Sequence, residues 1–218
     1  MNPLSAPLRI DFISDVACPW CAVGLNSLEQ ALATLEGEVP VELHFQPFEL
    51  NPDLGPEGVE AAAYLKAKYG LDDAQLARNR AQIQARGAEV GFTFGERGHV
   101  WNTFDAHRLL HWAAQQSPPA ARALKHALLQ AYHGEGRNPG DPEVLTALAA
   151  EAGLDPAEAR AVLDEGDFAA AVRDAEAQWQ QAGIRAVPSV VVNGRHLLQG
   201  GQPPHVYEQA LRQIAAGA

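Results

Sequence analysis

At 218 residues, the chain is long enough for one sizeable domain or a domain with a large insertion, and it can bury a core without disulfide bonds. Its formal net charge is −11 and its Lys and Arg residues are scattered, which argues against nucleic acid as a partner. No apolar run approaches the roughly 18–20 residues that cross a bilayer, and residues 1–8 lack the pattern of a secretory signal. We therefore expect a cytoplasmic protein that is not bound to a membrane.

The first part of the chain reads as a strand, a helix and a second strand. Residues 8–13 alternate enough between apolar and polar side chains to predict a strand. After Pro19, apolar residues recur every three or four positions, which predicts an amphipathic helix with proline in its first turn. Residues 41–47 predict the second strand. The two cysteines of the chain, Cys18 and Cys21, therefore fall at the turn between the first strand and the helix.

Residues 58–166 have a different composition, rich in Ala, Gln and Leu, with almost no strand pattern. Three prolines each follow a residue that can cap a helix, and proline is well tolerated in the first helical turn. These pairs are Ser117-Pro118, Asp141-Pro142 and Asp155-Pro156. We predict about five helices in this region.

The end of the chain returns to strand signals. We predict a long helix over residues 167–182 and a strand over residues 189–192. Asn193-Gly194 is a strong signal for a tight hairpin turn, so residues 196–199 are expected to pair with that strand. A closing helix is expected over residues 203–215.

Two cysteines three positions apart at the start of a helix are typical of thiol chemistry. The helix dipole and the unpaired N–H groups of the first turn favour a negative charge on Cys18. Cys21 lies about one turn further on, close enough to form a disulfide with Cys18. Cys18 can attack a substrate disulfide, and Cys21 can resolve the mixed disulfide. In a reducing compartment such a pair is more often catalytic or metal-binding than structural.

Half of a zinc site is the alternative interpretation of the two cysteines. Zinc takes four protein ligands, or three and a water, and the sequence has no second pair of cysteines. His107 and His111 are four residues apart and could bind a metal from one helix face, but such a pair more often lies on a helix surface. We therefore expect redox chemistry with no metal and no bound organic cofactor.

Three features together resemble the thioredoxin fold of the DsbA family over essentially the whole chain: the order of elements, Cys18-Pro19-Trp20-Cys21, and Val187-Pro188 before the final hairpin. Residues 47–52, 102–108 and 192–203 are similar to the FrnE-like cytoplasmic branch, which is related to 2-hydroxychromene-2-carboxylate isomerase and kappa-class glutathione transferases. The resemblance implies an α/β, thioredoxin-like fold with a large all-helical insertion. Its parts would be residues 1–53, 54–166 and 167–218.

The resemblance also implies roles for individual residues. Cys18 is the expected nucleophile and Cys21 the resolving thiol. A cis peptide bond before Pro188 is expected to face the two sulfurs and shape the substrate groove. The residues expected to contact the substrate beside them are Pro19, Trp20 and Val187.

Asn102 and His107 have two interpretations. Asn102 or Thr103 can be an ordinary helix N-cap, in which case the segment from Asn102 to Arg108 is structural. By analogy with the family, Asn102 and His107 instead line the groove beside the cysteines and contact the substrate.

Departures from the family pattern bear on the activity. Trp20 lies between the cysteines, where periplasmic members usually have His, and the extra C-terminal cysteines of some FrnE-like proteins are absent. Related isomerases and transferases have Ser in place of the first cysteine, so two cysteines favour dithiol exchange with protein thiols and disulfides. Glutathione is a candidate co-substrate, and a thioredoxin-type protein a candidate reductant. A kappa-type glutathione-dependent isomerase or transferase and a chaperone-like binding protein are the alternatives.

Overall fold

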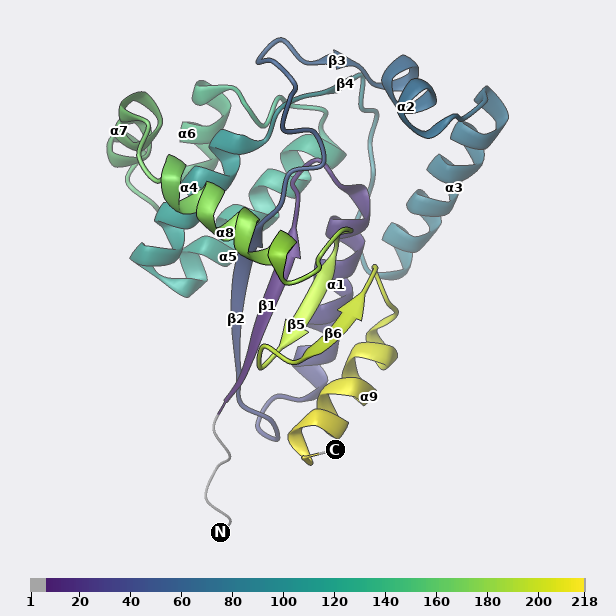
Figure 1. Cartoon of the computed structure of the whole chain (residues 1–218), viewed down its shortest axis with the longest axis vertical. Coiled ribbons are helices and arrows are strands. Elements are labelled where there is room, and N and C mark those ends of the chain that lie inside the picture. Colours follow the sequence, from purple (N-terminus) through teal and green to yellow (C-terminus); the bar gives the residue numbers. More distant parts are fainter. Residues whose placement is uncertain (1–6, 218) are drawn as a thin grey trace.

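The computed structural model describes residues 7–217, and a four-stranded mixed sheet lies at its centre (Figure 1). Its strands are β1 (Leu8–Ser14), β2 (Val41–Pro47), β5 (Ser189–Val192) and β6 (His196–Gln199). They follow the spatial order β2-β1-β5-β6. β1 pairs in parallel with β2 and antiparallel with β5, and β6 is antiparallel to β5. These four strands match the sequence prediction.

Alternating side chains of the sheet pack against helices on both of its faces. Ile10 and Phe12 point into a core shared with α1 (Pro19–Thr34) and α9 (Pro204–Ala215). Ile13 points the other way, into a smaller core beneath α8 (Ala169–Gln181). β1 is buried on both faces, so Arg9 is its one exposed residue, and the polar side chains of Asp11 and Ser14 are buried together with its apolar ones.

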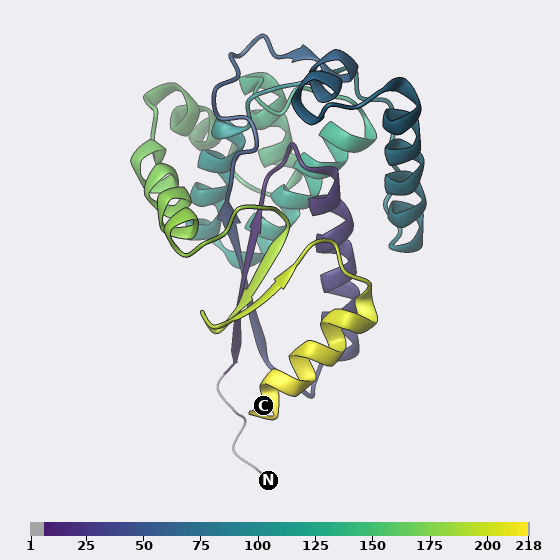
Figure 2. The same ribbon diagram turned by 45° about the vertical axis from the view of Figure 1, so that its right-hand side comes forward.

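A block of helices lies between β2 and α8 in the sequence and covers the end of the sheet where β1 and β2 finish (Figures 1 and 2). Six α-helices form it within the described residues, one more than predicted. They are α2 (Ala61–Tyr69), α3 (Asp73–Glu89), α4 (Phe104–Gln116), α5 (Pro118–Leu129), α6 (Pro142–Glu151) and α7 (Pro156–Glu165). A short π-helical turn, Gln130–Gly134, follows α5.

The expectation of almost no strand in this block needs a small correction. β3 (Val59–Glu60) and β4 (His99–Val100) form a two-stranded antiparallel ladder, with Val59 opposite Val100. Two residues are too short for any alternating pattern, so only the pairing across the fold reveals them.

Local signals gave the correct helix starts and the correct hairpin. Ser117, Asp141 and Asp155 each cap a helix that begins with proline, and their side chains accept hydrogen bonds from backbone N–H groups. Asn193 and Gly194 have φ angles of 53° and 66°, the left-handed values that a tight hairpin turn requires. No helix among residues 7–217 is long and apolar enough to cross a membrane.

The core of the helical block reaches the loop that leads to the cysteines. Val16 and Ala17 are buried in the same apolar cluster as side chains of α4, α5, α6 and α7. The loop between β1 and α1 is therefore fixed by the helical block as well as by the sheet.

Candidate active site

The two cysteines lie at the start of α1, directly after the loop that follows β1. Cys18 is the N-cap residue, with extended backbone angles, and Pro19 begins the helix. The Cys18 N–H donates to the carbonyl of Asp15 (3.2 Å), and the Cys21 N–H donates to the carbonyl of Cys18 (3.0 Å). Both thiols are free. Cys18 is 5% exposed and Cys21 is fully buried, so the two sulfurs occupy different environments.

These environments move the two pKa values in opposite directions. The Cys21 thiol donates to the Cys18 sulfur and lowers the pKa of Cys18, with help from the backbone N–H groups of Cys21 and Trp20, against burial and the charge of Asp15. Burial raises the pKa of Cys21 well above the ordinary thiol value, and the neighbouring Cys18 sulfur raises it further. Cys18 is therefore the thiol that ionises first, and Cys21 is held protonated.

Asp15 connects three parts of the fold beneath the cysteine loop. Its buried carboxylate accepts hydrogen bonds from the N–H of Ala17 (2.9 Å), the N–H of Leu50 (2.6 Å) and the hydroxyl of Thr103 (2.7 Å). Burial acts to raise the pKa of Asp15, but the imidazole of His107 and these N–H donors hold it below the ordinary value. Asp15 thus remains ionised and fixes the loop between β1 and α1.

Lys125 of α5 is buried near both sulfurs, with 1% exposure. Burial lowers its pKa, while the charges of Cys21, Asp15 and Cys18 act in the opposite direction. Its cation in turn acts to lower the pKa of Cys21. Lys125 was not among the residues expected at the site. The sequence held a signal, because Lys125 lies four positions after Ala121 and four before Leu129, on a helix face that is otherwise apolar.

The peptide bond between Val187 and Pro188 is cis, as the family resemblance implied. The Val187 carbonyl lies 3.6 Å from the Cys18 sulfur, at which distance the thiol can donate to it. The ring of Pro188 packs on α1 beside Gly24, where an added Cβ would lie only 2.8 Å from its Cγ. The segment before β5 therefore lies directly against the cysteine-bearing helix.

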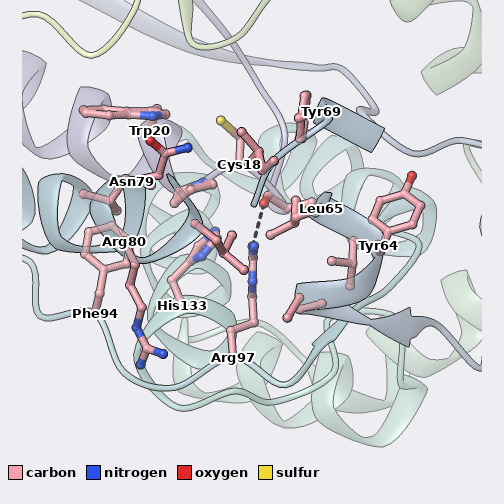
Figure 3. Close-up of a pocket in the computed structure, with 18 of the residues that line it drawn as sticks. Cys18, Trp20, Tyr64, Leu65, Tyr69, Asn79, Arg80, Phe94, Arg97 and His133 are labelled. Carbon is pink, nitrogen blue, oxygen red and sulfur yellow. Dashed lines mark hydrogen bonds between the residues drawn. The ribbon is translucent and has the colours of Figure 1, made fainter. Parts of the chain in front are cut away.

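A cavity of about 760 Å³ opens in front of Cys18, between the start of α1 and the helices α2 and α3 (Figure 3). Cys18, Pro19 and Trp20 form one wall. The facing wall is largely apolar and includes Tyr64, Leu65, Leu76 and Ile83. These residues were not singled out from the sequence, since apolar side chains at helical spacing are equally typical of a core face.

Four of the residues expected at the substrate groove are not part of this cavity wall: Val187 and Pro188, which border Cys18 as described above, and Asn102 and His107. The cavity wall does not include Asn102, whose side-chain oxygen accepts a hydrogen bond from the N–H of Phe104 (2.8 Å) at the start of α4. It does not include His107 either, which is 3% exposed and lies 3.5 Å from Asp15. His107 is therefore a buried residue beside Asp15 at the base of the site, whereas Asn102 precedes Thr103, the N-cap residue of α4, and bonds to the first turn of that helix.

The sheet order, the cysteine pair at the start of α1 and the cis bond before β5 together define a protein of the thioredoxin-fold class. Residues 9–212 match the protein family described as DSBA-like thioredoxin domain, and the chain belongs to that family. It is a family of thiol oxidoreductases and isomerases.

Individual relatives cover nearly the whole chain. The crystal structure of a probable DsbA oxidoreductase from Streptomyces coelicolor is 36% identical, with a TM-score of 0.89 over 96% of this chain and 90% of that one. YwbO of Bacillus subtilis, described as uncharacterized, is 27% identical over 205 residues, which are 94% of this chain and 96% of YwbO. The cytosolic disulfide reductase DsbM of Pseudomonas aeruginosa, solved with GSH, has a TM-score of 0.67 at 18% identity, covering 95% and 99% of the two chains. At that identity the likeness to DsbM shows the fold alone.

Proposed function

We propose that this chain is a cytoplasmic dithiol–disulfide exchange enzyme that works through Cys18-Pro19-Trp20-Cys21. The observation that carries the proposal is the contrast between the two thiols. Cys18 has a lowered pKa and lines a cavity, whereas Cys21 is fully buried with a raised pKa. A nucleophile needs both ionisation and access, and a resolving thiol needs to stay protonated until a mixed disulfide forms.

The exchange has two steps. The Cys18 thiolate attacks one sulfur of a substrate disulfide, forms a mixed disulfide and releases the other sulfur as a thiolate, which takes up a proton. The Cys21 thiol then loses its proton and attacks Cys18, which releases the second substrate thiolate and leaves a Cys18–Cys21 disulfide. The substrate gains two electrons and the enzyme loses two. The same steps in reverse oxidise a dithiol.

Neighbouring residues assist these steps in the proposed mechanism. The raised pKa of Cys21 opposes formation of its thiolate. The Lys125 cation stabilises that thiolate as it forms. Pro19 and Trp20 contact the substrate from the cavity wall, while Val187 and Pro188 border Cys18 on its other side. We propose protein thiols and disulfides as partners, with glutathione as a co-substrate or a thioredoxin-type protein as the reductant. The electrons pass through the cysteines without a bound cofactor.

Trapping of the mixed disulfide tests the proposal. After exposure to oxidised glutathione, the Cys21→Ser variant should carry one glutathione on Cys18 by mass spectrometry and should lose multiple turnover in an insulin-reduction assay. The Cys18→Ser variant should carry none and be inactive. A glutathione-dependent isomerase or transferase would keep its turnover without Cys21, because there the reacting sulfur belongs to glutathione. Full disulfide-exchange turnover by Cys21→Ser would show that the resolving role is wrongly assigned.

A further inference from the structure

The cavity in front of Cys18 carries few charged side chains. Its wall includes Asp73, Arg80 and Arg97. Asp73 forms an ion pair with Lys66, and Arg80 lies 3.5 Å from Glu96 at the exposed rim. Burial lowers the pKa of His133, which also lines the cavity, to about 3, so this imidazole is neutral at physiological pH. Of the charged side chains in the cavity wall, Arg97 is therefore the one still to be assigned a partner.

Arg97 has no carboxylate within ion-pair distance among residues 7–217. One of its N–H groups donates to the carbonyl of Ala17 (3.1 Å), the residue directly before Cys18 (Figure 3). Its guanidinium also lies over the ring of Tyr132, with 5.2 Å to the ring centre. A guanidinium has five N–H donors arranged in a fixed fork, and the Ala17 carbonyl takes one. Arg97 is thus anchored to the residue before the nucleophile and keeps N–H donors that this bond does not use.

A half-buried arginine in a largely apolar cavity is a strong site for a carboxylate. Charge-assisted hydrogen bonds from a guanidinium to a carboxylate are about twice as strong as neutral ones. The overall charge of −11 would otherwise repel anions from this protein. A cation beside the nucleophile therefore changes which substrates can reach Cys18.

We propose that Arg97 binds a carboxylate of the substrate and makes the enzyme selective for acidic disulfides. This inference rests on the proposed exchange function and names its substrate class. The carboxylate could belong to a low-molecular-weight disulfide or to an acidic residue beside a cysteine in a protein substrate. In both cases it lies a few bonds from the sulfur that Cys18 attacks.

Three small disulfides that differ in charge provide the test: dithiodipropionate, a dianion; bis(2-hydroxyethyl) disulfide, which is neutral; and cystamine, a dication. The second-order rate constant for each with the reduced protein is divided by the constant for 2-mercaptoethanol with the same disulfide, which removes differences in intrinsic reactivity. We expect the wild-type protein to prefer the dianion over the dication by about tenfold at low ionic strength. Salt should reduce this preference.

For each variant, the normalised rate constant with dithiodipropionate is divided by the one with bis(2-hydroxyethyl) disulfide. Arg97→Gln should lower this dianion-to-neutral ratio by about tenfold. Any general effect of the substitution on the nucleophilicity of Cys18 cancels in this ratio. Arg195→Gln is the matched control, since it removes the same charge from the turn between β5 and β6, which adjoins the start of β1 rather than its end. The ratio should be unchanged in that control.

A second arm identifies the source of the carboxylate. Two peptide mixed disulfides, with Glu or Gln beside the cysteine, are compared in the same way. If Arg97→Gln changes only the peptide ratio, the carboxylate belongs to protein substrates; if it changes only the small-disulfide ratio, it belongs to a low-molecular-weight disulfide.

Equal ratios in the wild type and Arg97→Gln for both sets would overturn the inference. If Arg97→Gln does not fold, Arg97→Lys, which keeps the charge but not the fork, is used instead and should lose part of the selectivity. A wild-type protein that reacts with the dication at least as fast as with the dianion would also overturn it. Failure of the exchange function itself would look different, because then no disulfide would react with Cys18 faster than with 2-mercaptoethanol.

Discussion

Glu49, which follows β2, and Glu176 of α8 bind the same guanidinium nitrogen of Arg173, although 127 residues separate them in the chain. Both carboxyl groups are buried, and each keeps one oxygen without a hydrogen-bond partner among the described residues. Burial raises the pKa of both residues, and the charge of Glu176 raises that of Glu49 further. Arg173 and His107 act in the opposite direction on Glu49. The environment between α8 and the end of β2 therefore favours protonation of Glu49 and Glu176.

The first prediction concerns the effect of this pair on stability. A carboxyl group whose folded-state pKa is raised contributes stability that is present below its unfolded pKa, about 4.3 for Glu, and is lost as the pH rises through the folded value. Glu49→Gln removes one of the two titrating groups. The free energy of unfolding of this variant, measured by urea denaturation from about pH 4 to about pH 8, should fall less with rising pH than that of the wild type.

The exposed Glu151→Gln of α6 is the control for this experiment and should follow the wild-type curve. The contribution of Asp15 to the free energy of unfolding changes with pH in the opposite direction. Its pKa is lowered in the folded state, so its contribution is lost only as the pH falls through that folded value. A Glu49→Gln curve parallel to the wild type between about pH 4 and about pH 8 would contradict the raised pKa of Glu49.

The second prediction concerns the acidity of Cys18. Ultraviolet titration of the thiolate should give a pKa for Cys18 below the free-thiol value of about 8.5. The largest cause is the hydrogen bond from Cys21, so Cys21→Ala should raise the pKa of Cys18. Cys21→Ser keeps an O–H donor at the same position and should raise it less. An unchanged pKa in both variants would show that the helix start, rather than Cys21, sets the acidity.

The third prediction concerns Lys125. Lys125→Met removes the cation but keeps a side chain of similar length, so the pKa of Cys21 should rise. A higher pKa leaves less Cys21 thiolate near neutral pH, so the mixed disulfide on Cys18 should be resolved more slowly, by about tenfold for each unit by which the pKa rises. The pH profile of resolution should move to higher pH, which a purely structural role would not cause. Burial disfavours the Lys125 cation, which has no carboxylate within ion-pair distance among residues 7–217, so its removal should not lower Tm.

The fourth prediction tests the contact between Gly24 and Pro188. Gly24→Ala places a Cβ 2.8 Å from the Pro188 ring and 3.4 Å from the Cα of Gly201. Overpacking of this kind costs about 1–3 kcal/mol, and the higher helix propensity of Ala recovers at most about 1 kcal/mol. We expect a net loss of about 1–2 kcal/mol in the free energy of unfolding. Gly98→Ala is the control, because its added Cβ would meet nothing within 4 Å.

The sequence alone determined the features that depend on neighbouring residues. The strands at residues 8–13 and 189–192, the helix that begins at Pro19 and the hairpin turn at Asn193-Gly194 follow from side-chain periodicity and backbone preference over a few positions. The place of Cys18 and Cys21 at the start of this helix follows in the same way, from the apolar period that begins after Pro19.

The tertiary structure decided what surrounds the two sulfurs. Asp15 and Thr103 are 88 residues apart in sequence, yet they form a hydrogen bond beneath Cys18. Lys125 and Arg97 reach the same loop from the helical block, and their side chains give no local sign of the partners they will meet. His107, expected in the groove, lies instead at the base of the site beside Asp15. Periodicity reports which face of an element is buried, but which elements share that buried space depends on how the whole chain packs.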